Sequence, residues 1–140
     1  MRNSLIRHTC VAWALLFSIN AFAATPQELL KQYESQAKQE DAKFTGFSAD
    51  KGASFFKEER MHSKGKKVSC VTCHTADPRN QGKTRANKVI EPMAPSINPQ
   101  RFTDVAKVEK WFGRNCNDVL ERTCTVQEKG DYLQFLLSVK

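Results

Sequence analysis

The sequence predicts a single all-α domain, and three observations support this prediction. Four segments carry apolar side chains at helical spacing, and most of them begin with residue types that cap a helix N-terminus. No segment shows the alternating pattern of a strand, and no internal repeat or second domain is found. Residues 75–102 have little periodicity and contain four prolines, which indicates a long loop between the second and third helices.

The first helix is expected over residues 26–40. Thr25 is a preferred N-cap residue, and Pro26 follows it at the first helical position, where a missing N–H has no cost. A second helix is expected to begin at Ser48. The first helix has a partial apolar stripe, formed by Leu29, Leu30 and Tyr33. The second helix carries Gly52, Phe55 and Phe56 on one side.

Two more helices are expected in the C-terminal part of the chain. One runs from about residue 104 to residue 115. Residues 125–128, Thr-Val-Gln-Glu, match a capping box, so the last helix is expected to begin there. The apolar side chains of these two helices are Val105, Val108, Trp111 and Phe112, and then Tyr132, Leu133, Phe135, Leu136 and Leu137.

The first 23 residues have the pattern of a secretory signal peptide. Arg2 and Arg7 give a basic start, residues 11–19 are mostly apolar, and residues 21–23, Ala-Phe-Ala, match a cleavage site. The apolar run is well short of the roughly 20 residues of a transmembrane helix, which favours cleavage over an uncleaved membrane anchor. We expect export to the bacterial periplasm, cleavage after about Ala23, and no membrane segment in the mature chain.

This cleavage leaves an N-terminal helical extension at residues 24–47 and a main domain at residues 48–140. The whole chain has 22 Lys and Arg residues against 15 Asp and Glu residues, a net charge of +7. Nucleic acid is not an expected partner, because the chain is exported and has no aromatic–basic reader motif.

Residues 70–74 read Cys-Val-Thr-Cys-His, the attachment signature of c-type haem. In this arrangement the Cys70 and Cys73 thiols each add to a vinyl group of one haem, and His74 binds the iron as proximal ligand. The alternatives are a thioredoxin-like redox pair and half of a zinc site. No βαβ pattern surrounds the motif, and the export signal favours haem c. Further zinc ligands would have to come from His62, Cys116 and Cys124.

The order of elements around the motif is that of class I cytochromes c. A short helix precedes the motif, a long loop that would wrap the haem follows it, and the C-terminal helix carries aromatic side chains. In this fold the first and last helices cross, and a small residue lets them approach. Gly52 and either Tyr132 or Phe135 are the candidates for that crossing.

Cys116 and Cys124 remain outside the haem motif. In an exported chain they are most simply a disulfide that closes a short loop, worth about 2–3 kcal/mol in the chain-entropy model. The alternatives are that one thiol is free or that one is itself a ligand of the iron.

The residue on the other face of the iron decides between an electron carrier and a gas-binding protein. A methionine is the usual distal ligand and keeps the iron low-spin and closed. Met93 is only 19 residues after His74, a short distance for a loop that must cross the haem edge. Met61 and His62 precede the motif. Further along, where the ligand usually falls, residues 111–117 contain neither methionine nor histidine.

Several of these segments resemble the sphaeroides haem protein (SHP) group, small class I cytochromes c that bind oxygen and nitric oxide. The resemblance covers about residues 48–137. It is carried by residues 84–88 (Thr-Arg-Ala-Asn-Lys), 92–95 (Pro-Met-Ala-Pro), 101–104 (Arg-Phe-Thr-Asp), 108–120 (Val-Glu-Lys-Trp-Phe-Gly-Arg-Asn-Cys-Asn-Asp-Val-Leu), 122, 124–125 and 128–131.

The resemblance implies that Asn115 is the distal ligand of the iron and that Cys116 and Cys124 form the disulfide. It also implies that Asn115 leaves the iron when the haem is reduced or when a diatomic gas (O2, NO or CO) arrives. The chemistry agrees, because an amide oxygen is a hard neutral donor that Fe(III) accepts and that softer Fe(II) holds poorly. Trp111 lies four residues before Asn115, on the same helix face, and is expected to wall the distal pocket.

Two functions therefore compete: a gas-binding cytochrome of the SHP type, with or without turnover, and a plain electron carrier with Met93 as distal ligand. In either, electrons come from another protein, which we expect to be a periplasmic c-type cytochrome. Arg85 or Lys88 is expected to pair a haem propionate. The basic cluster around the motif is expected to attract an acidic partner; it consists of Lys64, Lys66, Lys67, Arg79, Lys83, Arg85 and Lys88.

Overall fold

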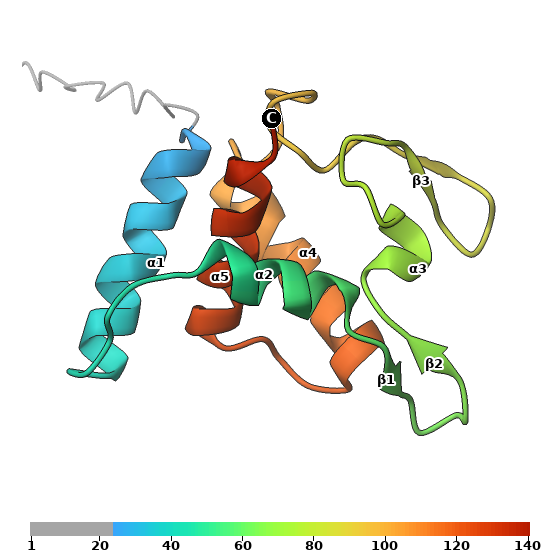
Figure 1. Cartoon of the computed structure of the whole chain (residues 1–140), viewed down its shortest axis with the longest axis horizontal. Helices are drawn as coiled ribbons and strands as arrows, with labels where there is room; N and C mark the ends of the chain where they lie inside the picture. Colours follow the sequence, from blue (N-terminus) through green and yellow to red (C-terminus); the bar gives the residue numbers. More distant parts are fainter. Residues whose placement is uncertain (1–23) are drawn as a thin grey trace, which may run out of the picture.

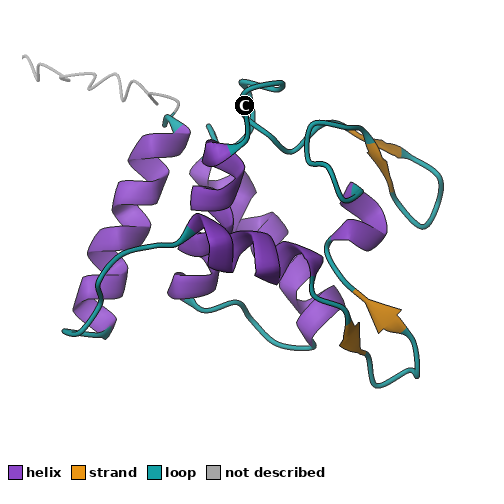
Figure 2. Cartoon of the chain, in the orientation of Figure 1, coloured by secondary structure: helices purple, strands orange, loops and turns teal. Residues whose placement is uncertain are grey.

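A computed structural model describes residues 24–140; the expected signal peptide, residues 1–23, lies outside the described residues. Within the described part, five helices and four short strands follow one another (Figures 1 and 2). They are α1 (Pro26–Glu40), α2 (Ala49–Lys57), β1 (Arg60–Met61), β2 (Lys67–Val68), α3 (Val71–His74), β3 (Gly82–Lys83), β4 (Val89–Ile90), α4 (Val105–Leu120) and α5 (Val126–Ser138). No helix among these is long and apolar enough to cross a membrane.

Helix α1 begins and ends where its sequence predicts. The Thr25 hydroxyl accepts the Glu28 N–H at 3.1 Å, and the Glu28 carboxylate accepts the Thr25 N–H at 2.6 Å, which completes a capping box. Leu29, Tyr33 and Ala37 recur every four residues and are buried, so one face of the helix joins the core. That face packs on α5, and the residues 24–47 extension is thereby part of the packed molecule.

Helices α2 and α5 cross at Gly52, as expected. A Cβ at this position would lie 1.9 Å from the Asp131 carbonyl oxygen and 2.8 Å from the Phe135 Cβ, so only glycine allows this approach. The residues of α5 that face Gly52 are therefore Asp131 and Phe135. Of the two candidates from the sequence, Phe135 lies at the crossing and Tyr132 does not. Tyr132 points into the core, and its ring packs on Phe56 and Phe112 at centroid distances of 5.9 and 5.5 Å.

Helix α4 is longer than expected: it runs to Leu120 and not to about residue 115. Its buried stripe continues from Phe112 to Cys116, four residues later. The expected stripe ends at Phe112 because Cys116 is not included among the apolar residues of this helix. The helix ends at Glu121, which has a left-handed backbone with φ of 57°. Asn115 thus lies inside the helix, one turn before its end.

No strands are expected from the sequence, but the structure contains two short hairpins, one before and one after α3 in the chain. β1 pairs antiparallel with β2, with Arg60 opposite Val68, and β3 pairs with β4, with Gly82 opposite Ile90. Strands of two residues are too short to show an alternating pattern, so the sequence could not reveal them. Gly82 brings β3 against α3, because a Cβ there would lie 2.0 Å from the Cys73 carbonyl oxygen.

Candidate haem site

The Cys-x-x-Cys-His segment forms the single helical turn α3. Cys70 is its N-cap residue, and the His74 N–H donates to the Cys70 carbonyl at 3.1 Å. Before the turn, the buried Ser69 donates its N–H to the Thr72 hydroxyl at 3.0 Å. This turn fixes the two cysteines and the histidine next to one another; Cys70 and Cys73 are both free thiols and half-buried. Burial raises the pKa of the Cys70 thiol to about 11.

The imidazole of His74 is in the form that binds a metal. Burial, assisted by the nearby positive charge of Arg101, lowers the pKa of His74 to about 4, so the ring is neutral at pH 7. Its Nδ1 is buried and has no hydrogen-bond partner within residues 24–140. A neutral, unpaired imidazole beside two free thiols is the donor set that haem c requires, and the described residues therefore fit this group.

The predicted distal residues share one face of α4. Trp111 and Asn115 are four residues apart and are both exposed, on a face that borders the buried stripe of Val108, Phe112 and Cys116. Trp111 is 43 % exposed, which is unusual for so large an aromatic side chain. The Asn115 amide makes no hydrogen bond to another described residue.

Met93, the alternative ligand, is a core residue. It is 9 % exposed, and its N–H donates to the Pro78 carbonyl at 2.8 Å, as does that of Ala94 at 3.0 Å. These bonds hold the middle of the long loop beside the segment that follows α3. Of the two residues that precede the motif, Met61 is 67 % exposed, whereas the His62 side chain is largely covered.

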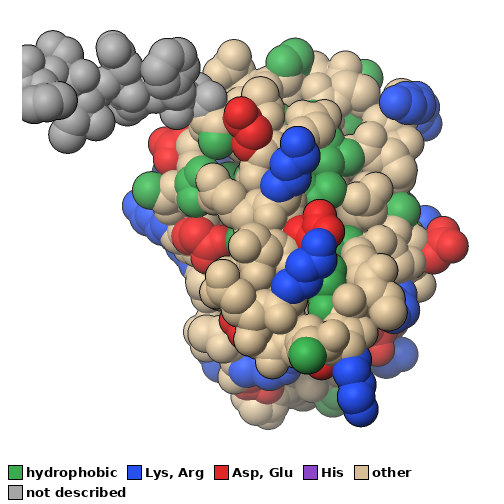
Figure 3. Space-filling model, turned by 90° about the vertical axis from the view of Figure 1, so that its left-hand side faces the viewer, with side chains coloured by type: hydrophobic (Ala, Val, Ile, Leu, Met, Phe, Trp, Pro, Cys, Tyr) green, Lys and Arg blue, Asp and Glu red, His purple; other side chains and the backbone are tan. Residues whose placement is uncertain are grey.

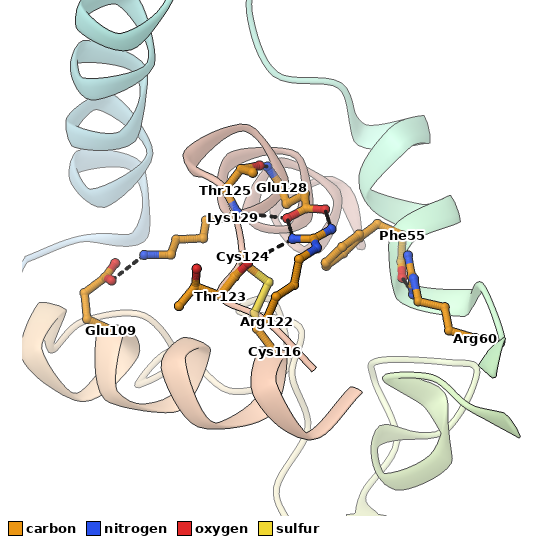
Figure 4. The surroundings of a disulfide bond; sticks show 10 residues. All are labelled: Phe55, Arg60, Glu109, Cys116, Arg122, Thr123, Cys124, Thr125, Glu128 and Lys129. Atoms are coloured by element: carbon orange, nitrogen blue, oxygen red, sulfur yellow. Dashed lines mark hydrogen bonds and ion pairs between the residues drawn. A yellow bond between two sulfur atoms is a disulfide. The ribbon is translucent and has the colours of Figure 1, made fainter. Parts of the chain in front are cut away.

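The sulfurs of Cys116 and Cys124 are bonded to each other, with the Cα atoms 5.6 Å apart (Figure 4). The bond joins the last turns of α4 to the residue that precedes the N-cap of α5. Between the two cysteines, Arg122 reaches forward and pairs with both carboxylate oxygens of Glu128, at 2.8 and 2.6 Å. Glu128 also accepts the Thr125 N–H at 2.8 Å, so the same carboxylate caps α5 and holds the disulfide loop.

Glu121 links the end of α4 to the hairpin before the haem motif, which sequence reasoning missed. Its carboxylate accepts the Ser63 N–H at 2.9 Å and the Ser63 hydroxyl, and it lies 3.5 Å from His62 Nε2. These hydrogen bonds from Ser63, with the charges of His62 and Lys64, lower the pKa of Glu121. The helix that carries Asn115 is thereby tied to the strand that leads into Cys70.

Two arginines near the haem motif have different surroundings. Arg85, which with Lys88 is an expected propionate partner, lies exposed in the β3–β4 turn and makes no hydrogen bond or ion pair with another described residue. Arg101 is half-buried and acts electrostatically on His74 and Tyr132. Nothing in the sequence distinguishes Arg101 from the other basic residues, because its position depends on how the long loop folds back.

Comparison with known proteins agrees with this geometry. Residues 42–136 match the family model described as a domain of unknown function, DUF1924. The chain is 44 % identical over 112 residues to the cytochrome c-type protein SHP of Cereibacter sphaeroides, covering 80 % of this chain and 82 % of that protein. It is 34 % identical over 136 residues to cytochrome c'' of Methylophilus methylotrophus, covering 95 % and 94 %.

Two solved structures share the fold. The crystal structure of oxidised cytochrome c'' from M. methylotrophus matches with a TM-score of 0.76, 34 % identity, and coverage of 82 % of this chain and 94 % of the other. The structure of oxidised SHP, described as an oxygen-binding cytochrome c, matches with a TM-score of 0.72, 43 % identity, and coverage of 81 % and 96 %.

A helical domain that presents two thiols and a buried, unpaired imidazole on one turn is a c-type cytochrome, a protein whose haem is attached to the chain. The chain belongs to the DUF1924 family and, within it, to the SHP group of cytochromes.

Proposed function

We propose that this chain is a periplasmic, monohaem cytochrome of class I fold whose distal ligand, Asn115, gives way on reduction so that O2, NO or CO can bind. The observation that carries the proposal is the face of α4 on which an amide without a hydrogen-bond partner stands beside an exposed tryptophan. Support comes from SHP, which is described as oxygen-binding, and from cytochrome c'', whose solution structure is described as giving insight into haem-ligand detachment.

The proposal gives each residue a role. Cys70 and Cys73 would hold the haem through thioether bonds, and neutral His74 would supply the proximal nitrogen. When bound, the haem supplies a redox-active iron with a position at which a gas can bind. The Asn115 Oδ1 would be the weak donor to that position in the oxidised protein, and after release the Asn115 amide N–H would be able to donate to a bound gas. Trp111 shields this position from water.

Helix α4 is suited to carry a ligand that detaches, because its backbone is held while the Asn115 side chain is not. The disulfide fixes the residue directly after Asn115, and the Glu121 bonds to Ser63 fix the end of the helix. The swing of one side chain therefore opens the site without movement of the helix. Such a change has a small conformational cost, and the gas then competes only with a weak internal ligand.

The test is the visible spectrum of the exported haem protein and its Asn115→Ala variant, each oxidised, reduced, and reduced under CO. The wild-type protein should be high-spin when reduced and should shift promptly with CO. Asn115→Ala should alter the oxidised spectrum and leave CO binding in place. A low-spin reduced spectrum that ignores CO, with an oxidised spectrum unchanged by the substitution, would identify a plain electron carrier with a strong ligand such as Met93.

The surface around the haem motif favours an acidic redox partner, which we expect to be another periplasmic c-type cytochrome. Residues 60–90 contain eight Lys and Arg residues and one acidic residue, Asp77, which pairs with Arg79 at 2.8 Å. The exposed Met61 on β1 and Val89 on β4 add apolar area of the kind found in docking surfaces. By contrast, basic and acidic side chains are interspersed on the face over α1 (Figure 3).

Small redox reagents test this surface without knowledge of the partner. The reduced protein should react faster with the anion ferricyanide than with a cationic cobalt complex of similar driving force, and the difference should shrink as salt is added. Lys66→Glu with Lys83→Glu should slow the anion reaction several-fold, whereas Lys31→Glu on α1 should have little effect. Equal slowing by the α1 variant would mean that only net charge matters and would refute a localised docking surface.

A further inference from the structure

Arg101 is held in a fixed position by backbone carbonyl groups. Its Nε donates to the Pro92 carbonyl at 2.9 Å, and its Nη2 donates to the Glu91 carbonyl at 2.5 Å. Its own N–H donates to the Asn98 carbonyl at 3.0 Å, in the turn before α4. A guanidinium anchored at two nitrogens has little rotamer freedom left to lose when a further group binds.

The charge of Arg101 has no counterion in the described part of the chain. None of the ion pairs among residues 24–140 involves Arg101, and its Nη1 makes no hydrogen bond there. Glu91 is the acidic residue that acts on it electrostatically, but the Glu91 carboxylate is exposed and accepts hydrogen bonds from Gln81 at 3.2 and 3.3 Å. A half-buried cation without a paired carboxylate is rare, because burial penalises an uncompensated charge.

The same guanidinium lies near the haem-binding residues. Its positive charge acts on His74 and on Tyr132, a buried residue of α5 that also interacts electrostatically with Cys70. Burial lowers the pKa of Arg101 itself, which places the group away from bulk water. Arg101 thus combines three properties: a fixed orientation, an uncompensated charge, and a position among the residues that would surround the haem.

We propose that Arg101 binds a carboxylate of the haem, one of its two propionates, through the guanidinium nitrogen that the backbone carbonyls leave free. Arginine and carboxylate form the strongest class of charge-assisted hydrogen bond, and the propionate supplies the counterion that the chain does not. Arg101, and not the exposed Arg85, is then the residue that orients the haem edge. This proposal rests on haem attachment alone and does not depend on displacement of Asn115.

The experiment measures the midpoint potential of the haem protein between pH 5 and pH 9, together with the propionate-bending band in its resonance Raman spectrum. Arg101→Gln should lower the potential, because loss of a positive charge near the iron favours Fe(III). It should also raise the propionate pKa, so that the potential varies more steeply with pH below neutrality. The propionate band should shift in this variant and remain unchanged in Arg85→Gln.

Arg101→Lys serves as the conservative variant, since it keeps the charge but loses the fork-shaped donor. Its potential should lie between those of wild type and Arg101→Gln, with a shifted propionate band, and it provides the test if Arg101→Gln does not fold. An unshifted band in both Arg101 variants, or a larger shift in Arg85→Gln, would overturn the proposal. The proposed gas chemistry would be untouched, because it is tested independently by Asn115→Ala.

Discussion

Among residues 24–140, three single residues have bonding capacity that the protein leaves unused and that the proposed haem would use. The buried Nδ1 and the neutral ring of His74, the amide of Asn115 and the guanidinium of Arg101 each leave hydrogen-bonding or charge capacity unused among the described residues. Buried polar atoms in native structures are normally satisfied, so the unpaired Nδ1 of His74 is an exception that requires an explanation. Under the two proposals above, one haem, with an iron and two carboxylates, would bind His74, Asn115 and Arg101 together.

At the same scale, Glu128 gives the stability of the protein a pH dependence. Hydrogen bonds from Arg122, supplemented by those from Thr125, hold the pKa of Glu128 below its usual value, and burial acts in the opposite direction. A carboxyl group with a depressed pKa in the folded state stabilises the protein above its unfolded pKa. This contribution is lost as the pH falls through the folded pKa, that is, below about 4.5.

Glu128→Gln should therefore lower the free energy of unfolding at pH 7 by about 0.5–1 kcal/mol, because glutamine still accepts the Thr125 N–H but has no charge for Arg122. The difference from wild type should be smaller at pH 3, because protonation of Glu128 removes the charge that pairs with Arg122. Urea denaturation at the two pH values measures it. Glu34→Gln, in an exposed ion pair on α1, is the control, and a difference for Glu128→Gln that stays constant from pH 7 to pH 3 would contradict the assignment.

At the scale of the elements, the long helices depend on close contacts that the sequence marks only in part. The N-cap Thr25 with Pro26 and the capping box at Thr125 predict the starts of α1 and α5, because each signal lies within four residues. The end of α4 is not predicted, since the stripe residue that extends it is Cys116 and its stop is a left-handed Glu121 where glycine is usual. That conformation of Glu121 coincides with its bonds to Ser63, a contact between distant segments.

Two glycines of the helices should respond in opposite ways to alanine. A Cβ at Gly52 would collide with the Asp131 carbonyl, so Gly52→Ala should force α2 and α5 apart and lower the free energy of unfolding by about 2–3 kcal/mol. Gly113 lies on α4 with no atom within 4 Å of an added Cβ, so Gly113→Ala should raise it by about 0.5–1 kcal/mol. Thermal unfolding followed by circular dichroism measures both. Stabilisation by Gly52→Ala would show that the two helices do not cross at this point.

For the whole molecule, the helical character and the haem-attachment turn follow from sequence, whereas the surroundings of the haem do not. The spacing of Cys70, Cys73 and His74 is a local feature of the sequence, so it can be recognised without knowing how the rest of the chain folds. Glu121 and His62 are positioned by contacts between the end of α4 and the β1–β2 turn, and Arg101 by the carbonyls of Glu91 and Pro92 in the long loop. No periodicity in the sequence reports such contacts. The helix α1 is intermediate: its boundaries are local signals, but its packing on α5, through Leu29, Tyr33 and Ala37, is visible only in three dimensions.

The uneven distribution of charge gives the molecule an electric dipole. Residues 60–90 hold eight basic residues against one acidic residue, whereas the rest of the described chain has 14 acidic residues against 12 basic ones. A molecule with this separation rotates in the field of a negatively charged surface before contact is made. For the acidic partner proposed above, the side that carries α3 would arrive first, so a larger share of random collisions would begin with the haem-attachment turn facing that partner.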